Sequence, residues 1–177
     1  MMKIRKICLI LVFALFPFFL HAQDFFISAS ASVGAVLGPD FIDTDETSHS
    51  IGGELYFGRL LFFGLDFSMN DIVFSDTKTF SGATGEFYIF DGVSGLSLNL
   101  GLARYFIGAG AGGYLCNYTG TSNDPDFGGF ALNLFTAGYL KLYDTFNIGL
   151  NYKLYGLFGA GWYNTFGVFV CFSLEDF

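Results

Sequence analysis

Apolar and polar residues alternate with a period of two along most of the chain. In the stretch FNIGLNYKL, residues 146–154, every second residue is apolar and the gaps hold Asn, Gly and Lys. Successive side chains of a β-strand point to opposite faces, so this period predicts strands with one apolar face and one mixed face. The same alternation runs through residues 27–37, 61–70, 96–100, 132–142 and 165–172.

Breaks in the alternation divide the chain into eight segments. Tight connections at 58–60, 101–104 and 143–145 alternate with longer ones at 38–50, 71–86, 119–126 and 156–161, of which the last is apolar. Short turns on one side and long loops on the other are typical of barrels that cross an outer membrane. The predicted fold is therefore all-β: an eight-stranded antiparallel up-and-down transmembrane β-barrel.

Two other folds fit the pattern less well. A soluble lipocalin-like barrel would turn its apolar face inward around one core. Here Leu and Phe occupy one face of every segment, while Ser, Asn, Asp and Lys occupy the other, which favours lipid outside and a mixed lumen inside. A membrane helix over 95–116 would hold Arg104 near its centre, at a cost of about 2.5 to 3.5 kcal/mol.

The first 22 residues have the features of a secretory signal peptide, which leaves 23–177 as one barrel domain. Basic residues precede an apolar run from Ile7 to Leu20, and Leu20 and Ala22 fit a cleavage site. Without this segment, five basic residues oppose sixteen acidic ones, a net charge of −11. Nucleic acid is therefore not expected as a partner. At 53% hydrophobic and 20% aromatic residues, a soluble domain would expose large apolar patches.

Residues 107–113, IGAGAGG, match the glycine spacing of a dinucleotide-binding loop. Such a loop must open a helix, whereas the residues that follow are rich in Asn, Gly, Thr, Asp and Pro. We therefore assign the stretch to a strand with Gly108, Gly110 and Gly112 in the lumen. Either Phe135 and Tyr139 of the next strand fill the space that these glycines leave, or it stays open; filling is favoured.

The same alternation, in which every second residue of a strand faces inward, also places charged and aromatic residues in the lumen. The inward charges are Glu54, Asp66, Asp91, Lys141, Lys153 and Glu175, and the inward rings are Phe26, Tyr56, Phe62, Tyr114, Phe135 and Tyr139. A salt-bridged plug is favoured over a polar pore because buried charges are rarely left unpaired. The rings would suit an apolar ligand better than an ion. Cys116 and Cys171 are expected inside the barrel at different depths, with no disulfide bond between them.

Little in the sequence indicates catalysis or metal binding. His49 lies between two serines with Glu54 nearby, but the spacing is not that of a catalytic triad, so we expect no enzyme activity. The acidic residues of the long loops form a predicted solvated crown rather than a metal site. They are Asp40, Asp43, Asp45 and Glu46, then Asp71, Asp76 and Glu86 against Lys78, then Asp124 and Asp126. We expect neither metal nor cofactor.

With these features the sequence resembles the eight-stranded outer-membrane barrels, the group of OmpW, OmpX and the OmpA transmembrane domain, over essentially all of 23–177. In TFGVFVCF, the residues that fit the signal read by the barrel assembly machinery on a last strand are Thr165, Gly167, Val170 and Phe172. The chain also ends in Phe177, although SLEDF separates the two features. Tyr105 and Phe106 before the glycines are similar to strand five of OmpW-like and porin-family barrels.

The resemblance implies a protein of the cell outer membrane that contacts its lipid and the assembly machinery, and we expect both termini in the periplasm. It implies two roles and does not choose between them. One is a minor channel or binding pocket for small hydrophobic solutes, with such a solute as ligand. The other is a non-transporting barrel that anchors acidic surface loops for adhesion or envelope integrity.

Overall fold

The structure is a computed structural model that describes residues 26–37, 48–73, 84–119, 127–143, 145–159 and 161–175. The expected signal peptide, its cleavage site, the acidic residues at 40–46 and Phe177 lie outside the described residues. Among the residues that are described, no helix is both long enough and apolar enough to span a membrane.

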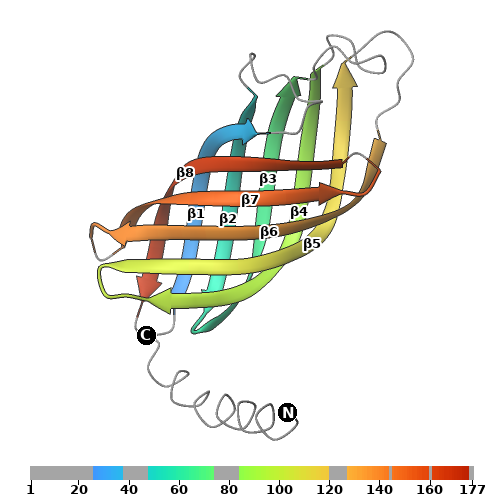
Figure 1. The fold of residues 1–177 in the computed structure, drawn as a ribbon. Helices are drawn as coiled ribbons and strands as arrows, with labels where there is room; N and C mark the ends of the chain where they lie inside the picture. Colours follow the sequence, from blue (N-terminus) through green and yellow to red (C-terminus); the bar gives the residue numbers. More distant parts are fainter. Residues whose placement is uncertain are drawn as a thin grey trace, which may run out of the picture.

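Eight antiparallel strands form one closed barrel, as the alternation predicts (Figure 1). Each strand pairs with the next, and β8 pairs with β1 to close the sheet. The strands are β1 (Phe26–Leu37), β2 (His49–Gly58), β3 (Leu61–Val73), β4 (Thr84–Asn99), β5 (Ala103–Thr119), β6 (Phe127–Lys141), β7 (Phe146–Leu157) and β8 (Gly161–Glu175). The fold prediction is confirmed.

The connections at the two rims differ in length. The rim where β1 begins and β8 ends carries the short turns β2–β3, β4–β5 and β6–β7 (Figure 1); we call it the short-turn rim, and the opposite one the long-loop rim. In the β4–β5 turn, Gly101 has a φ of 80°, and its N–H donates to the Asn99 side chain at 3.1 Å. Glycine adopts this left-handed conformation without steric cost.

The prediction of a fourth long loop at 156–161 is wrong. The β7–β8 ladder continues to the pair Leu157 and Gly161, and Gly159, with a φ of 95°, allows a tight turn there. The apolar residues in this stretch extend the strands. The predicted loop at 71–86 is also shorter, because Val73 pairs with Thr84 and both strands run further toward the rim.

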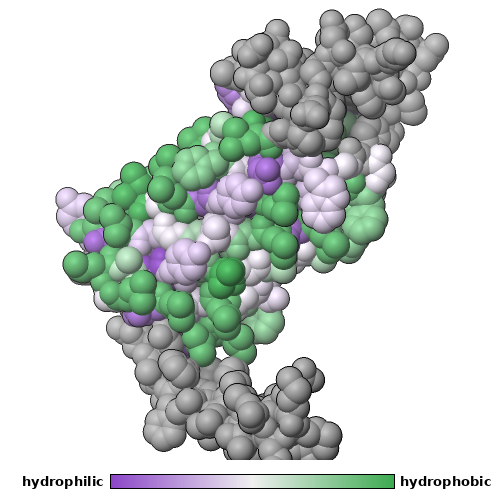
Figure 2. All heavy atoms as spheres, viewed as in Figure 1, coloured by the Kyte–Doolittle hydropathy of each residue, from purple (hydrophilic) through white to green (hydrophobic). Residues whose placement is uncertain are grey.

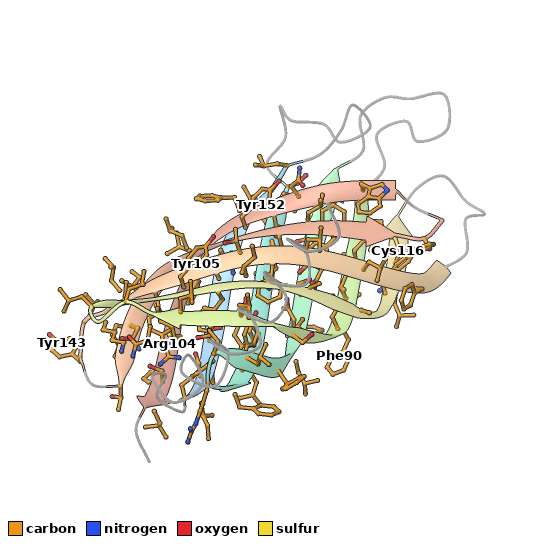
Figure 3. The ribbon with its side chains drawn as sticks, turned by 60° about the horizontal axis from the view of Figure 1, so that its bottom comes forward. Phe90, Arg104, Tyr105, Cys116, Tyr143 and Tyr152 are labelled. Carbon is orange, nitrogen blue, oxygen red and sulfur yellow. The ribbon has the colours of Figure 1, made fainter. Side chains whose placement is uncertain are left out.

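The outer surface of the barrel is apolar and its interior is mixed. On β7, Leu150 is 53% exposed whereas the adjacent Asn151 and Lys153 are buried. A soluble protein would bury its leucines and expose its lysines, so this distribution fits lipid around the barrel. Figure 2 shows apolar residues over much of the β5–β8 side. Tyr143 at the short-turn rim (Figure 3) and Trp162 near the long-loop rim are exposed, as in the aromatic girdles of membrane barrels.

The expected assembly signal lies inside β8 rather than at its end. Thr165 and Gly167 are buried, Val170 and Phe172 are exposed on the outer face, and the strand continues to Glu175. The separation of Phe172 from the end of the sequence therefore needs no shift in register. Recognition by the assembly machinery stays a prediction.

Candidate functional site

The centre of the lumen holds an ion cluster that bridges the barrel. Lys153 on β7 places its Nζ 2.8 Å from Glu54 Oε1 and 2.7 Å from Asp66 Oδ2. Glu54 also accepts hydrogen bonds from Asn151 Nδ2 at 3.1 Å and from the Ser30 hydroxyl. Glu54 and Asp66 lie on β2 and β3, so the cluster joins these strands to β7, which is far from them in sequence. We call it the central ion cluster.

A third carboxylate extends this cluster along the sheet. Asp66 pairs in register with Glu54 on one side and with Asp91 of β4 on the other, so three acids form a row across neighbouring strands. Asp91 is 1% exposed and accepts a hydrogen bond from Asn133 Nδ2 at 2.6 Å. Lys153 therefore forms ion pairs with two of the three buried acids, Glu54 and Asp66.

Aromatic rings fill the half of the lumen toward the short-turn rim. The buried members of this cluster are Phe26, Tyr56, Phe62, Phe106, Phe135, Tyr139 and Phe169. Their centroids lie 5.0 Å apart for Tyr56 and Phe62 and 5.4 Å apart for Phe62 and Phe106, distances typical of favourable ring pairs. Little room remains between them.

Arg104 anchors this aromatic cluster. It is fully buried, its guanidinium carbon lies 4.3 Å from the centre of the Phe26 ring, and its Nη1 donates to the Ser97 hydroxyl at 3.0 Å. A guanidinium over a ring gains a cation–π interaction. The alternation predicted Arg104 in the turn at 101–104 and not in the lumen. Arg104 lies two residues before Phe106 on the same strand, and this spacing indicates that both side chains face the lumen.

A second aromatic cluster closes the half toward the long-loop rim. Its largest members are Phe87, Ile89, Tyr114, Tyr155 and Tyr163. Tyr155 and Tyr163 have centroids 5.2 Å apart, and the Tyr114 hydroxyl donates to the Phe158 carbonyl at 2.8 Å. The central ion cluster therefore lies between two layers of rings.

The three glycines of β5 face these interior side chains. A Cβ on Gly108 would lie 2.8 Å from the Phe135 ring, and one on Gly110 would lie 2.7 Å from Asn133 Oδ1. A Cβ on Gly112 would collide with the Phe90 carbonyl. The space is thus taken by Phe135, Asn133 and the β4 strand. Tyr139 supplies none of the atoms nearest to these three positions, and its register partner is Arg104.

We expect Gly108→Ala to destabilise the barrel by about 1 to 3 kcal/mol, the usual cost of overpacking. The new methyl group would lie 2.5 Å from the Ser94 carbonyl as well as against Phe135. Gly113→Ala is the matched control on the same strand, because the nearest atom to its Cβ is 3.6 Å away. Urea titration of folding into lipid vesicles compares the two. Equal stability of both variants would contradict tight packing at Gly108.

The remaining predicted lumen charges lie away from the centre. Lys141 is half-buried near the short-turn rim, where its Nζ donates to Asn99 Oδ1 at 3.3 Å. The side chain of Glu175 lies outside what the structure describes. A pocket beside the central ion cluster, lined by Ser32, Ser68 and Lys153 among others, has a volume of about 10 Å³. This is roughly the space of one water molecule.

The residues weighed for catalysis do not converge. His49 is exposed, whereas Ser48, Ser50 and Glu54 are buried. His49 and Glu54 have opposite parity on β2 and so lie on opposite faces of the wall. The two cysteines are also apart: Cys116 belongs to the cluster toward the long-loop rim and Cys171 to the one toward the short-turn rim, and they are not bonded to each other.

The fold is that of known outer-membrane barrels. Ail, the attachment invasion locus protein of Yersinia pestis, solved with the heparin analogue sucrose octasulfate, matches 86% of this chain and 99% of its own, with a TM-score of 0.59 and 12% identity. Neisserial surface protein A matches 85% of this chain and 96% of its own, with a TM-score of 0.53 and 9% identity. The N-terminal barrel domain of Pseudomonas aeruginosa OprF matches 83% of this chain and 97% of its own, with a TM-score of 0.51 and 10% identity.

The sequence matches no family profile and no curated protein. At identities of 9 to 12%, the structural likenesses show the fold alone. That fold is the eight-stranded antiparallel transmembrane β-barrel.

Proposed function

We propose that the protein is a non-conducting barrel of the outer membrane that anchors acidic loops at the cell surface for contact with a cationic partner. The observation that carries this proposal is the filled lumen. Lys153 bridges Glu54 and Asp66 across the bore at 2.7 to 2.8 Å, and an aromatic cluster lies on each side. The short-turn rim and both termini face the periplasm, and the long-loop rim faces outward.

Acidic residues at the long-loop rim support a cationic partner. Asp71 and Glu86 are exposed and pair directly in register on β3 and β4, although like charges opposite each other destabilise a sheet. His49 of β2 is the next residue in this row. The sequence holds further acidic residues, Asp40, Asp43, Asp45 and Glu46 among them, outside the described residues. Binding residues commonly concentrate on such loops above a rigid scaffold.

The charge of the loops predicts a different partner from that seen with Ail. Ail was solved with a heparin analogue, sucrose octasulfate, which is a polyanion. This chain has a net charge of −8 with its N-terminal segment included, and its acidic loops would repel such a ligand. Shared architecture therefore does not imply a shared ligand.

The packing of the described part of the lumen does not favour passage of small hydrophobic solutes. That role depended on space beside Gly108, Gly110 and Gly112, and Phe135, Asn133 and the β4 backbone occupy it. An apolar solute would have to displace these packed side chains, at a cost of about 1 to 3 kcal/mol or more.

The experiment has two arms. The purified barrel in a planar bilayer should show no conductance steps. Neutralising the first loop with Asp40→Asn, Asp43→Asn, Asp45→Asn and Glu46→Gln should weaken binding of vesicle-reconstituted protein to a polylysine surface by about tenfold, since each exposed charge pair contributes about 0.2 to 1 kcal/mol.

The charge-preserving set Asp40→Glu, Asp43→Glu, Asp45→Glu and Glu46→Asp is the matched control and should leave polylysine binding unchanged. Stable conductance steps would contradict the closed lumen. Equal binding by the neutralised and control sets would remove the first loop as the contact.

A further inference from the structure

A groove runs across the outer wall formed by β5 to β8. It is an open depression with a volume of about 670 Å³. Small residues at Ala103, Thr136 and Gly138 lie between larger ones such as Leu140 and Leu150. Figure 2 shows paler, less apolar residues along this wall among the green ones. We call this feature the wall groove.

Hydroxyl groups lie within the wall groove. Thr136 Oγ1 is within hydrogen-bond distance of both the Tyr105 hydroxyl and the Phe106 carbonyl. Because threonine has one hydroxyl proton, Thr136 donates it to the carbonyl and accepts from Tyr105. The ring of Tyr105 also packs on Gly138, whose Cβ would lie 3.3 Å from Tyr105 Cδ2. These two hydroxyls are therefore satisfied inside the protein and leave the surface effectively apolar.

Tyr152 contributes the third hydroxyl. It pairs in register with Thr136 and is 39% exposed, and Figure 3 shows it on the same wall as Tyr105. Tyrosines of membrane barrels concentrate at the two interfaces, whereas Tyr152 lies midway along β7. Tyr152 is part of the lining of the wall groove, to which its ring adds apolar surface.

The surroundings of the wall groove identify its occupant. Its lining includes Leu100 and Leu140 beside the short-turn rim and Phe166 and Val168 toward the middle of the wall, and these side chains are exposed parts of the lipid-facing surface. The groove is therefore continuous with the apolar band and opens into the leaflet next to the short turns. Bilayer hydrocarbon must fill any volume there.

We propose that the wall groove binds one acyl chain of a membrane phospholipid, so that one lipid stays on the β5–β8 wall while lipids elsewhere around the barrel exchange freely. The chain lies along the small residues of the groove, between the larger apolar side chains beside them. This inference does not depend on the proposed role of the loops.

The test uses full-length mature protein in vesicles of phosphatidylethanolamine and phosphatidylglycerol that contain a trace of phosphatidylethanolamine with a diazirine on one acyl chain. After photolysis, mass spectrometry maps the labelled residues. We expect labels to concentrate on groove residues. Gly138→Phe fills the groove and should lower that labelling by about tenfold. This corresponds to a loss of about 1.4 kcal/mol in the free energy of lipid binding, because apolar contact with the acyl chain is removed.

Gly92→Phe is the matched control, because Gly92 is exposed on β4 and the nearest atom to its Cβ is 3.9 Å away. It should leave groove labelling unchanged. Heat-modifiable gel mobility reports whether each variant folds, and Ala103→Leu replaces Gly138→Phe if the latter does not. Labelling spread evenly around the barrel, or unaffected by filling the groove, would overturn the proposal.

Discussion

Lys153→Met should destabilise the folded barrel by about 3 to 5 kcal/mol, the cost of removing one partner from a buried ion pair. The substitution keeps an unbranched apolar side chain of similar length but removes the cation that contacts Glu54 and Asp66. Both carboxylates are at most 7% exposed, so water cannot replace it without opening the lumen. Urea titration of folding into vesicles measures the loss.

Two further variants separate charge from packing in this prediction. Lys141→Met removes a half-buried cation near the rim, whose hydrogen bond to Asn99 is 3.3 Å long, and should cost about 1 kcal/mol or less. Adding Glu54→Gln and Asp66→Asn to Lys153→Met should recover much of the stability, because no net charge then remains unpaired at those positions. If Lys153→Met is no less stable than Lys141→Met, the central ion cluster does not hold the lumen together.

Parity along the sequence predicts which side chains enter the lumen, because a strand in a membrane barrel has one face in lipid and one inside. Glu54, Asp66 and Lys153 follow from it directly. Parity does not say which inward residues meet. Asn151 and Glu54 are 97 positions apart in sequence, and Lys153 and Asp66 are 87 apart. Those contacts depend on register and on the curvature that brings β7 opposite β2 and β3.

Other features could not be predicted from the sequence, each for a different physical reason. Arg104 was assigned to the turn at 101–104, yet β5 begins at Ala103 and its second residue already points inward. The β7–β8 connection was predicted to be long because the alternation breaks at 156–161, whereas a left-handed Gly159 closes it tightly. The wall groove depends on small residues of different strands lying together, which no single strand reveals.

Leu150→Arg should destabilise the barrel by about 2 to 4 kcal/mol, because a charge on the lipid face near the bilayer midplane is costly. Leu150 is 53% exposed on the outer face. The cost should fall in vesicles of shorter-chain lipid, since the guanidinium then reaches the interface more easily. Folding titrations in lipids of two chain lengths measure this dependence.

Asn151→Arg is the matched control on the adjacent residue. Asn151 is 6% exposed and donates to Glu54 at 3.1 Å, so the larger side chain must displace packed neighbours at a cost of about 1 to 3 kcal/mol. That cost arises inside the barrel and should not change with lipid chain length. A lipid-dependent cost for Asn151→Arg together with a lipid-independent one for Leu150→Arg would mean that the two faces of β7 are reversed. The central ion cluster would then face lipid, where buried charges have no protein partner to compensate them.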